Sequence, residues 1–346
     1  MLIPHQKLTI EPSDILKSII NQPKNNLKKY IPKQNIYLTG SGRSALKSII
    51  QSNNLKNIGI PAFTCCAVEI GVKSAKANPI FINSHIIPEI KDYPKIDALV
   101  LPYNFGFLPD IEKIKKECKK RNIILIEDCC QALGAKYKNK LAGSFGNYAF
   151  YSFGISKNIG IAGGALASNK KELVRLENYP KKEIFNLILK GFAAKYILNP
   201  KFYNKKLIEK ELLKNQKDLN YKMPNILKKI ILTQIKRYNK ILNIRTKNGK
   251  MCLKELDGII DFVKPIKNTE PSWLYFILLS KKRKEIIKKL LKEKVDLQPM
   301  LTFKDLSKNS PLATKAEKEH FGFALYRPEK EVEFIIKKIK KVMKSY

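Results

Sequence analysis

The chain has 346 residues, 44% of them hydrophobic, which is enough for one large folded unit and a smaller one. No unbroken apolar run reaches the roughly 18 residues of a membrane span, and no secretory signal opens the chain, so we expect a cytoplasmic protein. The formal net charge is +37, but only seven of the 67 basic residues are arginine and the lysines are dispersed, which argues against binding of nucleic acid.

Short apolar runs alternate with helix-period segments in the first part of the chain, a pattern typical of a parallel sheet covered by helices. We expect strands at 36–38, 58–60, 79–82, 98–101 and 123–126, and further short strands within 148–168. Helices are predicted between them at 44–50, 67–72 and 111–120. The sequence therefore predicts an α/β fold.

The later part of the chain changes character. The pattern from about 170 to 217 is helical, apolar and basic, and 227–244 has the period of one long amphipathic helix. An α+β unit begins near Cys252, with a strand at 274–279 and helices at 284–294 and 331–343. We predict a large domain, 1–250, with a helical insert at about 180–215, and a small C-terminal domain, 251–346.

The six cysteines form no Cys-x-x-Cys pair; they are Cys65, Cys66, Cys118, Cys129, Cys130 and Cys252. Adjacent cysteines chelate a single metal poorly, so we predict no metal site. In a cytoplasmic chain they are expected to be reduced, small packing residues.

Lys157 lies on a polar, glycine-punctuated turn between an aromatic strand at 148–153 and an apolar run at 163–167. An amine on a tight loop between buried strands is poorly solvated, so we expect it to lose its proton at moderate cost and to attack a carbonyl carbon. Most lysines of this chain are solvated surface charges, so the neighbouring residues decide whether Lys157 is functional.

Two carboxylates, Glu127 and Asp128, end a fully buried strand. Ligands bind at this edge of open parallel sheets, and a carboxylate there is costly unless it meets a cation or hydrogen-bond donors. Taken alone, Asp128 could equally be a loop cap.

The turn at 40–44 follows a strand and opens a helix. Its glycines let the backbone approach an anion, and the first helical N–H groups point towards it. A cation in the first helical turn, such as Arg43, interacts unfavourably with the helix dipole by roughly 0.3–1 kcal/mol. A phosphate bound at this end of the helix would make the charge of Arg43 favourable. With Asp128, the amide of Gln131 and Lys157, this turn completes the set of groups that pyridoxal 5'-phosphate (PLP) requires.

On these residues the chain resembles the fold-type-I, PLP-dependent sugar aminotransferases of the DegT/StrS group. Matching segments occur in the family's order at 41–46, 61–65, 127–132, 143–146, 152–158, 220–223 and 273–276. The spacings Asp128/Gln131 and Ser152/Lys157 are the specific part. The resemblance implies a mostly parallel seven-stranded sheet covered by helices, with a smaller α+β C-terminal domain.

The resemblance also implies roles for individual residues. Lys157 would hold the cofactor covalently and carry the proton during transamination. Asp128 would pair with the pyridinium nitrogen, and Gln131 would lie against the 3-oxygen of the ring. The phosphate would be held by Gly42, Arg43, Ser44 and Ser152. Asn220 would reach the phosphate from the partner subunit, which implies a homodimer with shared active sites.

Four positions depart from the family pattern. Cys65 stands where an aromatic ring usually stacks on the cofactor, and the acid of the Gly-acid-Gly-Gly motif is missing from 161–164. Tyr103 and Gly154 replace histidines. We expect these changes to reshape the substrate pocket and to leave the cofactor-binding residues intact.

The favoured hypothesis is a PLP-dependent aminotransferase that moves an amino group, probably glutamate's, to a keto carbon of a nucleotide-activated sugar in polysaccharide or glycoconjugate biosynthesis. One alternative is a PLP enzyme acting on another keto substrate; dehydration is disfavoured because dehydrating relatives lose the lysine. The other is a degenerate member that binds a sugar nucleotide or a protein partner without catalysis.

Three features fall outside this site. His5, His85 and His320 flank no acid–base motif, so surface or cap roles are expected. The aromatic residues at 273–276 are expected in the core of the small domain. The apolar, basic segment 184–198 is either a helix packed on the large domain or the dimer interface, or a helix resting on an anionic membrane.

Overall fold

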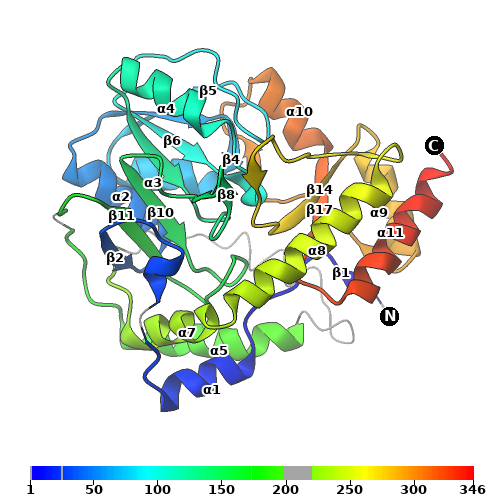
Figure 1. The fold of residues 1–346 in the computed structure, drawn as a ribbon, viewed down its shortest axis with the longest axis horizontal. Helices are drawn as coiled ribbons and strands as arrows, with labels where there is room; N and C mark the ends of the chain where they lie inside the picture. The colour runs from blue at the N-terminus through cyan, green and yellow to red at the C-terminus, as the bar shows by residue number, and fades with distance from the viewer. Residues whose placement is uncertain (1, 25, 173, 198–219) are drawn as a thin grey trace.

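The computed structural model describes residues 2–24, 26–172, 174–197 and 220–346. Its centre is a seven-stranded sheet, covered on both faces by helices (Figure 1). The strand order is β2 (Asn35–Thr39), β11 (Gly164–Ser168), β10 (Tyr148–Ser152), β7 (Ile124–Asp128), β6 (Ala98–Pro102), β3 (Asn57–Pro61) and β5 (Asn78–Ile82). Only β11 runs against the others, so the predicted mostly parallel sheet is confirmed.

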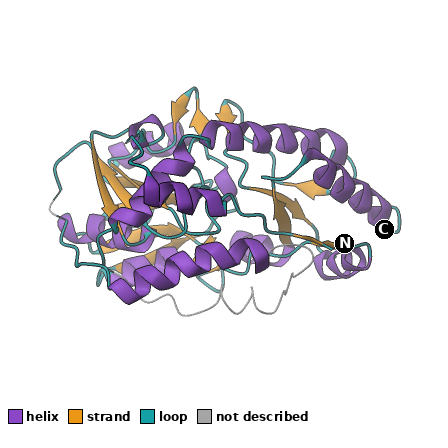
Figure 2. Cartoon of the chain, turned by 90° about the horizontal axis from the view of Figure 1, so that it is seen from below, coloured by secondary structure: helices purple, strands orange, loops and turns teal. Residues whose placement is uncertain are grey.

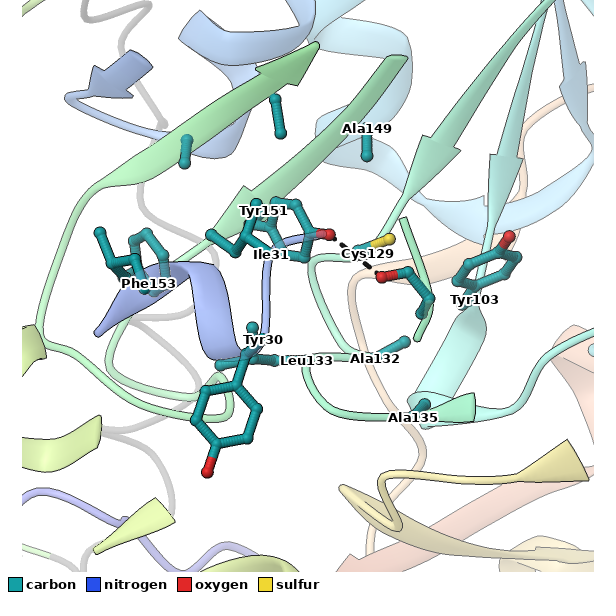
Figure 3. Packing of buried hydrophobic residues seen from close by; sticks show 14 of the residues in the cluster. Tyr30, Ile31, Tyr103, Cys129, Ala132, Leu133, Ala135, Ala149, Tyr151 and Phe153 are labelled. Carbon is teal, nitrogen blue, oxygen red and sulfur yellow. Dashed lines mark hydrogen bonds between the residues drawn. The ribbon is translucent and has the colours of Figure 1, made fainter. Parts of the chain in front are cut away.

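Both faces of the sheet are buried because its strands alternate apolar side chains between two cores. In β10, Tyr148 and Phe150 pack with α2 (Gly42–Ser52) and α3 (Cys66–Ser74). Ala149 and Tyr151 face the opposite core, with α4 (Ile111–Lys120). Figure 3 shows part of that second core, where the Tyr151 hydroxyl donates to the carbonyl of Ala142 over 3.1 Å.

Three more helices cover the second face: α1 (Pro12–Ile20), α5 (Lys181–Ile197) and α7 (Asn225–Ile235). Helix α1 was not predicted, although Pro12 at its first position and the acidic side chain of Asp14 are ordinary helix-start features. Residues 174–180 are not helical, and the rest of the predicted helical insert beyond residue 197 lies outside the described residues.

The single long helix predicted at 227–244 is wrong: the chain forms α7 and then α8 (Tyr238–Leu256), with a break at 236–237. At the break, Arg237 has φ −105° and ψ 5°, and its guanidinium binds the carboxylate of Asp14 and the carbonyl of Thr9. Helix α8 then runs from the large unit into the small one (Figure 1).

The small unit contains an antiparallel sheet of β12 (Asp261–Phe262), β14 (Tyr275–Leu279) and β17 (His320–Ala324). Its helices are α9 (Arg283–Lys292), α10 (Pro311–Glu319) and α11 (Glu329–Met343). The division at residue 250 stays a prediction, and it falls inside the continuous helix α8.

Short strands join the two units. The N-terminal β1 (Ile3–Pro4) pairs with β15 (Val295–Asp296), and β4 (Phe63–Cys65) pairs with β16 (Phe303–Asp305). A third group is β8 (Lys136–Tyr137), β9 (Lys140–Leu141) and β13 (Thr269–Glu270). Within the described residues, no helix has the length and apolarity needed to cross a bilayer.

Candidate active site

The predicted site residues follow the carboxyl ends of four parallel strands. Residues 41–44 follow β2, Cys65 follows β3, Asp128 ends β7, and Ser152 ends β10. Because these ends meet at one edge of the sheet, segments far apart in the sequence come together there. Lys157 lies on the loop that leads from β10 to β11.

Contacts at Gly42 show how tightly the first part of the site is built. A methyl group at Gly42 would lie 3.0 Å from the sulfur of Cys130 and 3.2 Å from Cβ of Ser152. One at Gly164 would lie 2.4–2.5 Å from the backbone of Ser41 and Gly42. Strand β11 therefore needs glycine at 164 to let the turn before α2 pack against it.

The start of α2 has the geometry of an anion site. Ser41 is the N-cap, and its hydroxyl accepts the N–H of Ser44 over 3.1 Å. The Ser44 hydroxyl is buried and lies 2.9 Å from that of Ser41. Arg43 occupies the first helical turn, as predicted, and is partly buried.

Asp128 is buried, and burial raises its pKa above the ordinary value. The Cys130 N–H donates to its Oδ1 over 2.9 Å, and this bond and the nearby Lys157 lower the pKa by less than burial raises it. The Cys130 side chain also hydrogen-bonds to this carboxylate and lowers its pKa. A buried carboxylate of this kind is stabilised further by a cation or another donor.

Burial alone would lower the pKa of Lys157, but the negative forms of Cys65, Cys130, Asp128 and Tyr275 act on the amine and raise its pKa overall. The expected easy loss of the lysine proton is therefore wrong for the chain by itself. The amine is a cation surrounded by groups that can become negative, and opposite charges favour the protonated form.

Cys65 lies at the N-cap of α3, next to the same lysine. The thiol of Cys66 shares a hydrogen bond with Cys65 and, with Lys157 and the Ala67 N–H, lowers the pKa of Cys65 to about 6 despite burial. These contacts favour the thiolate form of Cys65. All six cysteines are free thiols.

Gln131 is buried beside the site, where its amide oxygen accepts the N–H of Phe105 over 2.6 Å. That bond leaves the NH2 group to donate elsewhere. Phe105 has a φ of 59°, which is costly for a bulky residue and shows that the segment after β6 is held in place by its surroundings.

Tyr103 corrects one expectation. It does not reshape a substrate pocket, because it lies in the hydrophobic core (Figure 3) and donates its hydroxyl to Glu127 over 2.7 Å. Glu127 also accepts three backbone N–H groups at 2.5–2.7 Å, from Gly143, Phe145 and Gly146. The second strand-end carboxylate is therefore an internal anchor for the 143–146 segment.

Three side chains from elsewhere in the chain hold the loop that carries Lys157. The side chain of Asn158 accepts from Arg245 of α8 over 2.6 Å, and its carbonyl accepts from Thr9 over 3.1 Å. The N–H of Gly160 donates to the amide oxygen of Gln234 in α7 over 2.7 Å. These long-range supports follow no motif, so sequence patterns could not identify them.

Tyr275 is a further residue of the site, although it was expected only in the small-domain core. It is buried, and burial raises the pKa of its hydroxyl, although three cations that act on it, Lys157, Arg245 and Arg327, offset part of that rise. Its ring packs edge-on against Phe105, with 6.3 Å between ring centroids. The small unit therefore contributes a side chain beside Lys157.

Asn220 is the one predicted site residue that the structure does not bring to Lys157 of its own chain. Its side-chain NH2 donates to the Arg175 carbonyl over 3.2 Å. It lines a cavity of about 650 Å³ with residues 48–56, at the far end of α2. Its buried Oδ1 accepts no hydrogen bond in the described part of the chain.

Two of the three histidines are buried. His320 is the C-cap of α10 and is buried, so a surface role is wrong for it; its Nε2 accepts the N–H of Met300 over 3.1 Å. His5 is also buried, whereas His85 is exposed.

A parallel sheet with a lysine loop, a buried carboxylate and a helix N-terminus at one edge defines an α/β protein with a cofactor-type site. The chain belongs to the DegT/DnrJ/EryC1/StrS aminotransferase family, whose family model matches residues 20–323.

Individual relatives agree with this assignment. GDP-perosamine synthase of Escherichia coli O157:H7 is 25% identical over 253 residues, 70% of this chain and 64% of that protein. The next two curated relatives are matched over 40% and 47% of their lengths, so this chain spans less than two thirds of each of the three.

Solved structures show the same fold at low identity. PseC of Helicobacter pylori, an aminotransferase of pseudoaminic acid biosynthesis, superposes with a TM-score of 0.77 at 16% identity and full coverage of both chains. Spr1654 of Streptococcus pneumoniae, in its PLP form, gives a TM-score of 0.76 at 18% identity, covering 100% of this chain and 99% of that one. The fold-type-I architecture expected from the sequence is confirmed.

Proposed function

We propose that the protein is a PLP-dependent aminotransferase that acts on a keto carbon of a nucleotide-activated sugar. The observation that carries the proposal is the meeting of Lys157 with the buried Asp128 at the sheet edge where α2 begins. Family membership and the names of the relatives, which include GDP-perosamine synthase, support the reaction class and the substrate class.

The residues fit the cofactor in three respects. Asp128 offers a buried carboxylate to a ring-nitrogen proton, and the amine of Lys157 lies close enough to interact with it. Glycines at 42 and 164 keep the turn before α2 open to an anion, since a methyl group at either position would meet neighbouring atoms. PLP supplies an electron sink for bonds at the amino-bearing carbon when it is bound.

We assign each residue a separate task. Lys157 would hold the cofactor's aldehyde carbon and would move protons to and from the reacting carbon. Asp128 would keep the ring nitrogen protonated, because a nearby negative charge favours the charged form of the ring. The NH2 of Gln131 would donate to the 3-oxygen, and Cys65 would be the residue next to the ring. Residues 42–44 and Ser152 would hold the phosphate.

Reduction with borohydride tests the assignment. After incubation with PLP and reduction, peptide mapping should place the pyridoxyl group on Lys157, and Lys157→Ala should lose it. Lys264→Ala is the matched control, because Lys264 is exposed and ion-paired with Asp257. Labelling of other lysines alone, or no labelling, would contradict the proposal and favour a degenerate member of the family.

The substrate class needs its own measurement. With glutamate as donor, the protein should convert a nucleotide-linked keto sugar to an amino sugar, detected by mass spectrometry of the nucleotide product. A free keto sugar without its nucleotide should react at least about 100-fold more slowly, because the binding energy of the nucleotide is not available. Equal rates would contradict the nucleotide requirement.

We propose further that two chains share each active site through Asn220. The support is that Asn220 lies away from Lys157 of its own chain and keeps a buried oxygen without a donor. Mixing Lys157→Ala chains with Asn220→Ala chains would give heterodimers with one intact site, so activity should partly return. Mixed dimers that form but stay inactive would overturn the shared site.

A further inference from the structure

Apolar side chains on α1 and α5 are exposed to an unusual degree. Of the seven large hydrophobic residues exposed in the described part of the chain, five lie on these two helices, between 50% and 83% exposed: Leu16, Ile19, Ile20, Phe185 and Leu189. The two helices pack against each other and lie on the same side of the molecule (Figures 1 and 2). We call this surface the α1–α5 face.

Helix α5 is apolar on both sides. Leu187, Ile188 and Phe192 pack against the core, while Phe185 and Leu189 point outward. A water-facing helix ordinarily carries polar residues on its outer side, so two large apolar side chains there, among the exposed lysines of α5, indicate a surface that meets an apolar partner.

Lysines accompany the exposed apolar residues. Lys17, Lys181 and Lys182 are exposed and take part in no ion pair within the described residues, and Glu183 is the exposed acid beside them. This combination of an apolar strip with basic flanks matches the interfacial region of an anionic bilayer, where lysine meets phosphate and the apolar side chains enter the acyl boundary.

A second copy of the chain fits this face less well. A two-fold dimer buries the same patch against itself, which would bring the lysines of one chain towards those of the other. We therefore propose that the α1–α5 face docks on an anionic membrane surface. From the sequence, a membrane contact is considered for 184–198 alone, and the proposed face adds a second helix, α1. The structure does not describe the side chains of 194–198.

The face is attached rigidly to the core. Gly191 lets α5 approach closely, since a methyl group there would lie 2.6 Å from Ile161 and 3.1 Å from Ile15. Ile161 belongs to the loop that carries Lys157, so docking would hold the proposed active site close to the bilayer. The inference does not depend on the chemistry at Lys157.

Vesicle flotation of the 346-residue protein tests whether the α1–α5 face docks on an anionic membrane. The protein should float with vesicles of phosphatidylcholine and phosphatidylglycerol, stay behind with phosphatidylcholine alone, and be released by high salt. Ile19→Gln/Ile20→Gln and Phe185→Gln/Leu189→Gln should each weaken partitioning about tenfold or more. Lys17→Gln/Lys181→Gln/Lys182→Gln should weaken it and flatten its salt dependence.

Leu291→Gln is the matched control, because Leu291 is also exposed, 40%, but lies on α9. It should float like the parent, and all variants should keep the parent's melting temperature. Three outcomes would overturn the proposal: no flotation of the parent, unchanged flotation of the α1 and α5 variants, or conversion of a dimer to monomers by those variants, which would identify a second copy as the occupant.

Discussion

The guanidinium of Arg245 donates to the side chain of Asn158, the residue after Lys157, over 2.6 Å, and both side chains are almost fully buried. Burial lowers the pKa of Arg245, and the acidic groups that act on it are tyrosine hydroxyls, Tyr238, Tyr275 and Tyr326. A charge in such surroundings is costly, so we infer that Arg245 is present to position the loop that carries Lys157.

We expect Arg245→Met to slow half-transamination with glutamate about 100-fold, because a loosened loop misplaces the amine of Lys157. Stability should change little or rise, since a buried charge is replaced by an apolar side chain of similar length. Stopped-flow kinetics and thermal unfolding measure the two effects. Lys247→Ala, an exposed residue on the same helix, should behave like the parent.

Asp128→Asn should keep the fold and some bound cofactor, but its half-transamination rate should fall about 100-fold or more. The reason is that the negative charge that keeps the ring nitrogen protonated is gone. The amide oxygen can still accept the Cys130 N–H. The absorbance of bound cofactor and single-turnover kinetics separate binding from chemistry. A variant that transaminates like the parent would show that Asp128 does not pair with the ring nitrogen.

Gly164→Ala should weaken PLP binding, because the added methyl group would meet the backbone of Ser41 and Gly42 at 2.4–2.5 Å and displace the turn before α2. Equilibrium dialysis with PLP measures the loss. Gly154→Ala is the control in the same region: its methyl group would make ordinary contacts at 3.6–3.7 Å. Equal cofactor affinity in the two variants would contradict a phosphate site at this turn.

His320 should make stability depend on pH. Burial lowers its pKa from 6.5 to about 4, so the folded protein holds it neutral while the unfolded chain binds a proton below pH 6.5. Its contribution is present above pH 6.5 and is lost as the pH falls towards 4, by about 3 kcal/mol of unfolding free energy. Urea unfolding at several pH values should show this fall, and His320→Gln should reduce it more than His85→Gln does.

Periodicity predicted the sheet well because its strands are buried on both faces and read as apolar runs. It failed at α7 and α8, where Arg237 at the break binds Asp14, more than 200 residues away in sequence, a contact that local periodicity does not show. Helix α1 was missed although its own residues carry start signals, because its polar and apolar residues form only a nine-residue pattern.

The candidate site also contains residues that the sequence could predict and residues that it could not. Lys157, Asp128, Ser152 and the turn before α2 come together because each follows a strand end, a placement that spacing can predict. Tyr275 and Arg245 could not be found this way, since each reaches Lys157 or its loop only through the packing of the small unit and α8 against the large unit.

Residues 3–9 form a strap across the two units. Ile3 pairs with Val295 in the small unit, the carbonyl of His5 accepts from Ala324, and Thr9 donates to the carbonyl of Asn158 beside Lys157. A rotation of one unit against the other would therefore stretch the few residues between Ile3 and Thr9, in addition to disturbing the strand pairs and helix α8 that also join the units. The length of this N-terminal segment is thus one of the features that limit how far the site can open.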